Sequence, residues 1–226
     1  MHYQVSLKLK ADTFQQFQQI HQQINQAGSA AQAKILGENF AKIACEIIDQ
    51  AFGQLVTQSG SADAESGKVL KQVKDSVAKY MPWSVSFFGN ERLAPMVNHV
   101  QGMMAQRDGQ AFIAYPVEQA LVSELLSCIA KMREGKQEAV LPGLKAFTQI
   151  VDQGVSSLVR EPKSLLKFNV VVDKTLNGVI HLTTQLAYKR FEKISTLYPA
   201  QQITGFFDHF FAFLTDNATT QDNALN

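Results

Sequence analysis

The chain has 226 residues, 46% of them apolar and 18% charged, which is the composition of a globular protein long enough to bury a sizeable core. Its 21 basic and 20 acidic residues leave a net charge of +1, without the positive surplus that nucleic-acid-binding proteins use to hold phosphates, so we expect no nucleic-acid partner. Two cysteines are too few for a disulfide framework, and no apolar run reaches the roughly 18–20 residues that cross a bilayer, so we expect a cytoplasmic protein with no transmembrane segment.

The first element in chain order is the one strand that the hydrophobic pattern predicts. Tyr3, Val5, Leu7 and Leu9 alternate with polar residues, which is the two-residue period of a half-buried strand. Such a strand needs a partner, either residues 111–117 or the same strand of a second subunit. The alternative is an extended arm that lies over helices.

From residue 12 onward, helical periodicity dominates the sequence. Apolar residues recur at three- and four-residue intervals, and prolines at 82, 162 and 199 mark expected breaks. The predicted helices cover about 12–27, 30–57, 67–81, 91–107, two segments between 117 and 161, 163–197 and 200–215. The predicted fold class is therefore all-α, a bundle of seven to eight helices to which one short N-terminal β-strand can be added.

A small, polar stretch rich in Gly and Ser is the clearest internal boundary. Residues 58–67 are predicted to be a flexible spacer between an N-terminal part, 1–57, and a helical bundle, 68–214. The two parts form either separate domains or one. Residues 215–226 are predicted to be a disordered tail.

The last predicted helix has a broad aromatic face. Phe206, Phe207, Phe210 and Phe211 fall on one side of a helical wheel, and burying each contributes about 1.5–3 kcal/mol. A face this apolar is not expected to stand open to water. It caps the bundle's own core, pairs with another subunit or protein, or rests on a lipid-like surface.

A second aromatic cluster lies in the irregular stretch 80–93. Trp83, Phe87, Phe88 and Arg92 beside a proline turn have the composition of an interaction hot spot. The alternative is a loop that folds its aromatic side chains back over the core.

No stretch carries a catalytic, cofactor or metal-binding signature. The five histidines have no acidic residue or second histidine at helical spacing, both cysteines lie in mid-helix, and glycine-rich phosphate loops are absent. We therefore expect no cofactor. The alternative is a small-molecule pocket between helices, near His99 and Met103.

Three functional hypotheses follow, and none is singled out by a motif. The leading one is a non-enzymatic, cytoplasmic helical bundle that binds another protein or self-associates. The second is a coat protein for hydrophobic granules or lipid surfaces, comparable in role to phasins. The third is a small-molecule-binding protein or enzyme with a pocket between helices. The sequence does not decide whether the protein is an enzyme, and it favours a protein that is not.

Overall fold

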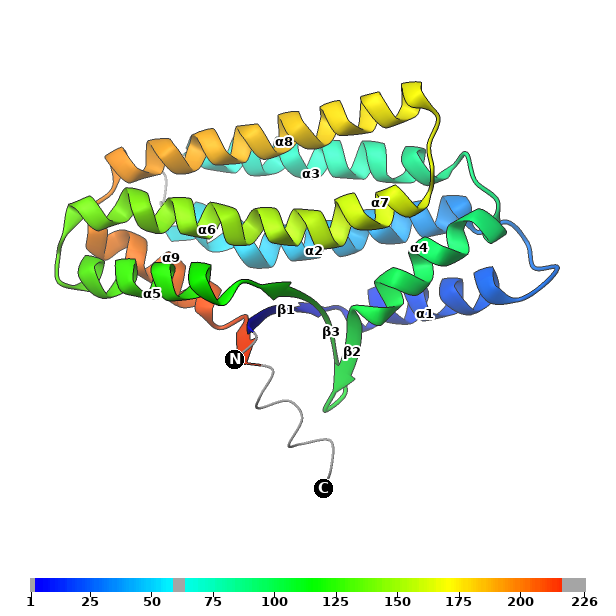
Figure 1. Cartoon of the computed structure of the whole chain (residues 1–226), viewed down its shortest axis with the longest axis horizontal. Coiled ribbons are helices and arrows are strands. Elements are labelled where there is room, and N and C mark those ends of the chain that lie inside the picture. The colour runs from blue at the N-terminus through cyan, green and yellow to red at the C-terminus, as the bar shows by residue number, and fades with distance from the viewer. Residues whose placement is uncertain (1–2, 59–63, 217–226) are drawn as a thin grey trace.

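The computed structural model describes residues 3–58 and 64–216, and within them it has nine α-helices and a four-stranded antiparallel sheet (Figure 1). The helices are α1 (Ala11–Asn25), α2 (Ala33–Gln58), α3 (Ala64–Val85), α4 (Asn90–Gly102), α5 (Gln119–Arg133), α6 (Val140–Val155), α7 (Glu161–Leu165), α8 (Val170–Leu197) and α9 (Ala200–Phe211). This architecture confirms the mostly helical fold class.

The predicted N-terminal strand exists and lies inside a small sheet. The strands are β1 (Tyr3–Leu9), β2 (Met104–Arg107), β3 (Gln110–Val117) and β4 (Leu214–Asp216), in the spatial order β2-β3-β1-β4. β1 pairs antiparallel with β3, so that Val5 is opposite Tyr115 and Leu7 is opposite Ile113. The partner of the first strand is thus the internal segment that the sequence offered.

Residues 104–107 correct the predicted helix over 91–107. Helix α4 ends at Gly102, and the following residues form β2, which is joined to β3 by a two-residue turn. Asp108 and Gly109 at this turn have φ values of 50° and 76°, the left-handed conformation of a tight hairpin. Pairing with β3 therefore ends the helix earlier than hydrophobic periodicity indicates.

Two prolines do not break the chain where they were expected to. Helix α3 continues through Pro82 to Val85, and the chain passes Pro162 by way of a π turn, Ser156–Arg160, that leads directly into α7. The actual interruption comes at residues 166–169, after which α8 begins. Asn169 starts that helix by accepting a hydrogen bond of 3.0 Å from the Val172 amide on its side-chain oxygen.

The elements are stacked in layers on one face of the sheet (Figure 1). Helices α2 and α6 cover β1 and β3, and the pair α3 and α8 lies beyond them, farthest from the sheet. Helices α5 and α9 flank the sheet at one end, and α1 and α4 flank it at the other. The outermost layer is thus formed by two long helices lying side by side.

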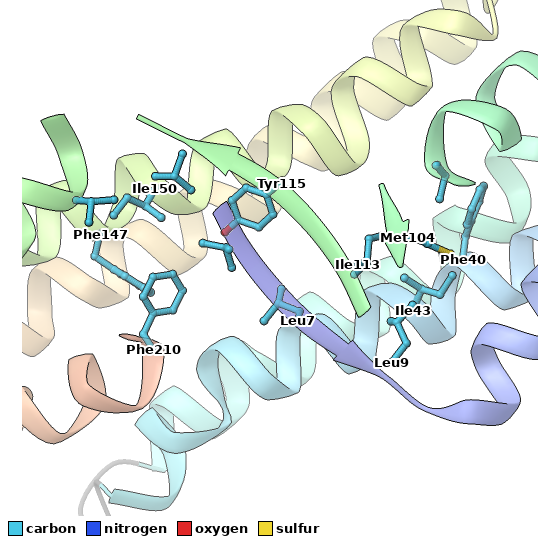
Figure 2. Packing of buried hydrophobic residues seen from close by; sticks show 14 of the residues in the cluster. Leu7, Leu9, Phe40, Ile43, Met104, Ile113, Tyr115, Phe147, Ile150 and Phe210 are labelled. Atoms are coloured by element: carbon cyan, nitrogen blue, oxygen red, sulfur yellow. The ribbon is translucent and has the colours of Figure 1, made fainter. Parts of the chain in front are cut away.

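One hydrophobic core joins these layers and draws residues from both sides of the predicted spacer. Leu7 and Phe40 from the N-terminal part belong to the same buried cluster as Ile113, Phe147 and Phe210 (Figure 2). Of the predicted spacer, residue 58 ends α2, residues 64–67 belong to α3, and 59–63 lie outside the described residues. Of the predicted tail, residues 215 and 216 belong to β4, and 217–226 lie outside the described residues.

Candidate functional site

The phenylalanine-rich helix α9 is part of the chain's own core. Phe206, Phe207 and Phe210 are each at most 1% exposed. Their rings lie 4.8 to 5.9 Å from the ring of Phe147 in α6, and Figure 2 shows Phe210 turned toward it. Phe211 is partly buried against the same core. Of the three alternatives for this face, burial in the bundle's own core is the one observed. The three buried rings therefore offer no surface to a partner.

Three aromatic side chains at the end of α3 and in the turn that follows it remain at the surface. Tyr80, Trp83 and Phe87 follow one another at intervals of three and four residues, which places neighbouring rings on one side of the chain. The Trp83 ring lies 6.3 Å from that of Tyr80 and 5.2 Å from that of Phe87, and both pairs meet edge to face. Phe87 is 53% exposed, and the other two are partly buried. These three residues are named the aromatic ladder.

Phe88 and Arg92, from the same predicted cluster, serve the fold instead. The buried Phe88 ring lies 5.0 Å from Phe168, in the connection between α7 and α8. The Arg92 guanidinium stacks 4.6 Å above the Phe88 ring and donates hydrogen bonds of 2.7 and 3.0 Å to the carbonyl oxygens of Leu166 and Lys167. Since carbonyls at a helix end lack intrahelical partners, this arginine caps α7. The predicted cluster therefore divides into an accessible ladder and an inward pair.

Helix α8 carries a second apolar surface, which the sequence reading did not identify. Val171, Leu182, Leu186 and Leu197 are 75, 65, 44 and 59% exposed. At 100° per residue they fall within about 80° of one another on the helix. These four residues are named the α8 stripe. The sequence held a signal for it, because α8 has apolar residues on more than one side, whereas a helix at the surface ordinarily has one apolar face.

The two candidate pocket residues lie in different structural settings. His99, in α4, has its Nε2 atom 3.8 Å from a Glu161 carboxylate oxygen and without a hydrogen-bond partner. Met103 follows α4 and accepts a hydrogen bond of 2.9 Å from the Ala114 amide, which extends the pairing of the sheet. Within the described residues, no group of three or more His, Cys, Asp or Glu side chains could hold a metal ion.

Both thiols are in surroundings that disfavour the thiolate. Burial raises the pKa of Cys45 and of Cys128 above the ordinary thiol value, and no disulfide joins them. A reactive cysteine needs the opposite shift. These residues are accordingly suited to packing.

A charged cluster at the π turn fastens α6 to α8. Arg160 donates to both Asp152 carboxylate oxygens at 2.9 and 3.0 Å, and the Tyr188 hydroxyl lies 3.1 Å from the same carboxylate. The hydrogen bond from Arg160 lowers the pKa of Asp152, and burial, followed by the nearby carboxylate, raises the pKa of Tyr188. Each polar group has a partner within the chain, so the cluster is an interhelical brace.

Comparison with known proteins adds no assignment: no family model, no curated protein and no solved structure matches the chain. Within the described residues, no helix combines the length and apolar character needed to cross a membrane. The aromatic ladder and the α8 stripe are therefore the surfaces on which functional proposals rest.

Proposed function

We propose that this protein is a non-enzymatic, cytoplasmic helical bundle that acts by binding another protein chain, with the aromatic ladder at the centre of the contact. The observation that carries this proposal is the exposure of Phe87 beside Trp83 and Tyr80. Trp and Tyr are the side chains most enriched in interaction hot spots, where they supply large contact area at small entropic cost.

The surroundings of the ladder also support a binding role. Phe88 and Arg92 anchor its base to the α7–α8 connection through the ring contact and two hydrogen bonds described above. A partner therefore meets aromatic groups that are already held in place, which lowers the entropic cost of association.

Native mass spectrometry of gently purified protein tests this function. We expect an assembly heavier than the 25.0 kDa chain, and its mass tells whether the partner is a second copy or another protein. Because Trp83 is the only tryptophan, its fluorescence should shift to the blue and resist quenching when the partner covers it.

A matched pair of variants tests the contact itself. Phe87→Ser should weaken the assembly at least tenfold, since a hot-spot side chain contributes about 2 kcal/mol or more. Leu126→Ser removes a side chain that is similarly exposed, 45% against 53%, but lies on α5, and it should leave assembly unchanged. A bare monomer, or equal effects of the two substitutions, would contradict the proposal.

The exposed α8 stripe favours a second candidate function, the coating of a hydrophobic or lipid surface. This role would use a different part of the molecule from the ladder. It can therefore be tested independently.

A further inference from the structure

The outer layer of α3 and α8 concentrates the exposed apolar surface of this protein. Ten large hydrophobic side chains are exposed among the described residues, and five of them are on α8: Val170, Val171, Leu182, Leu186 and Leu197. With 28 residues, α8 runs for about 40 Å. Figure 1 shows it on the outermost side of the molecule, alongside α3 and away from the sheet.

The same layer concentrates positive charge. Helices α3 and α8 together contain eight basic and four acidic residues, a net charge of +4, whereas the rest of the chain has thirteen basic and sixteen acidic residues. Lys68, Lys174 and Lys189 are exposed, and none forms an ion pair within the described residues. Lys79 is also exposed, but its ammonium lies over the Tyr80 ring, 5.1 Å from the centroid. The layer therefore has cations that are free to meet an external anion.

Charges and apolar side chains also share one side of α8. On the helical wheel Lys189 coincides with Val171, and Lys193, which is ion-paired with Glu65 of α3 at 3.4 Å, lies between Leu182 and Leu186. A lysine beside exposed leucines can lay its methylene stem along the apolar surface and hold its ammonium in the headgroup layer, where it meets lipid phosphates while the leucines enter the acyl boundary.

We propose that the outer face of α3 and α8 binds an anionic lipid surface, with the α8 stripe inserted and the three unpaired lysines, Lys68, Lys174 and Lys189, at the headgroups. Charge complementarity selects this occupant. A second copy would bring two faces of charge +4 together, and like charges repel. A neutral surface would leave the lysines without partners. This surface adjoins the aromatic ladder at Lys79, whose ammonium lies 5.1 Å from the centroid of the Tyr80 ring. The variants that test lipid binding therefore change residues of α8, which the ladder does not include.

Vesicle flotation with the full chain tests the inference. We expect the protein to rise with vesicles of equal parts phosphatidylcholine and phosphatidylglycerol at low salt, and to stay at the bottom with pure phosphatidylcholine. High salt should weaken the binding because it screens the lysines. Each lysine near an anionic surface should strengthen binding roughly fivefold, so Lys174→Glu/Lys189→Glu should lower vesicle affinity by more than about 25-fold.

Two further variants separate the contributions. Leu182→Ser/Leu186→Ser should reduce flotation while retaining the helical circular dichroism of the wild type, since the two side chains are 65 and 44% exposed. Lys8→Glu/Arg107→Glu makes the same change of charge on exposed residues of the sheet and should still float.

Several results would overturn the inference. If wild-type protein stays at the bottom with phosphatidylglycerol vesicles at low salt, the outer face does not bind anionic lipid. An acidic protein would then be the better candidate partner for the basic layer. Equal binding to pure phosphatidylcholine, or equal loss in the sheet variant, would show that this face does not recognise anionic lipid. None of these outcomes depends on assembly through Phe87, which native mass spectrometry reads separately.

Discussion

Replacing Gly37 by alanine should loosen the junction between α2 and α3, although alanine is the better helix former. A Cβ atom at this position would lie 2.4 Å from Pro82 Cα and 2.9 Å from Val85 Cγ2. Backbone atoms cannot rotate away, so the two helices would have to separate by about 1 Å to reach an ordinary contact. This position is also where α3 continues through a proline, so close packing against α2 helps offset the cost of that proline.

The magnitude follows from two opposing effects. Overpacking typically costs about 1–3 kcal/mol, or more against backbone, while exchanging glycine for alanine inside a helix contributes about 1 kcal/mol. We expect a net loss of about 2 kcal/mol in the free energy of unfolding. For a chain of this length that corresponds to a fall in Tm of about 4–8 °C.

Thermal and urea unfolding followed by far-UV circular dichroism measure this loss. Gly178→Ala is the matched control, because no atom lies within 4 Å of a Cβ added there, and it should raise stability by about 0.5–1 kcal/mol. Trp83 fluorescence gives a local readout, since this residue directly follows the displaced proline. A Gly37→Ala protein that gains as much stability as Gly178→Ala would refute the reasoning.

Three further predictions concern the core, a brace and the thiols. Phe210→Glu should unfold the monomer rather than dissociate an assembly. Removing the buried ring lowers the free energy of unfolding by roughly 3–5 kcal/mol, and burying an unpaired carboxylate adds to this loss. Circular dichroism distinguishes an unfolded chain from a folded monomer. Asp152→Asn should cost up to about 1 kcal/mol at neutral pH, the pair with Arg160 being partly exposed. The hydrogen bond from Arg160 lowers the pKa of the Asp152 carboxyl in the folded state. Its contribution to stability is therefore fully present above the unfolded-state pKa of about 3.9 and disappears as the pH falls through the folded-state pKa. Urea unfolding at several pH values should show the stabilities of the mutant and the wild type converging in acid. Cys45 and Cys128 should react with iodoacetamide at neutral pH more slowly than free glutathione, because burial raises both pKa values; equal rates would contradict this.

Local sequence patterns predicted most elements because their causes are local. Alternation over residues 3–9 identified β1, and the repeat of apolar residues identified the faces of α2, α5 and α6. The missed hairpin also had a local signal. Asp108–Gly109 between two short runs is a typical turn dipeptide, but the preceding helical pattern outweighed it.

The candidate site was only partly predictable for a different reason. Aromatic composition identified the stretch containing Trp83 and Phe87, but composition does not tell an exposed ring from a buried one. Phe88 is adjacent in sequence and turns inward because Phe168, some eighty residues later, supplies its contact. The exposed α8 stripe was missed because the same leucines would have satisfied a buried face.

The sequence by itself determined that the phenylalanine face of α9 had to be covered, because leaving several such rings in water would cost about as much as a domain's whole stability. Only the tertiary structure decided what covers it, namely Phe147 from a helix some sixty residues earlier. The physical reason applies throughout this chain. Periodicity records how much apolar surface an element has, whereas the surface left for a partner depends on which distant elements have already packed against it.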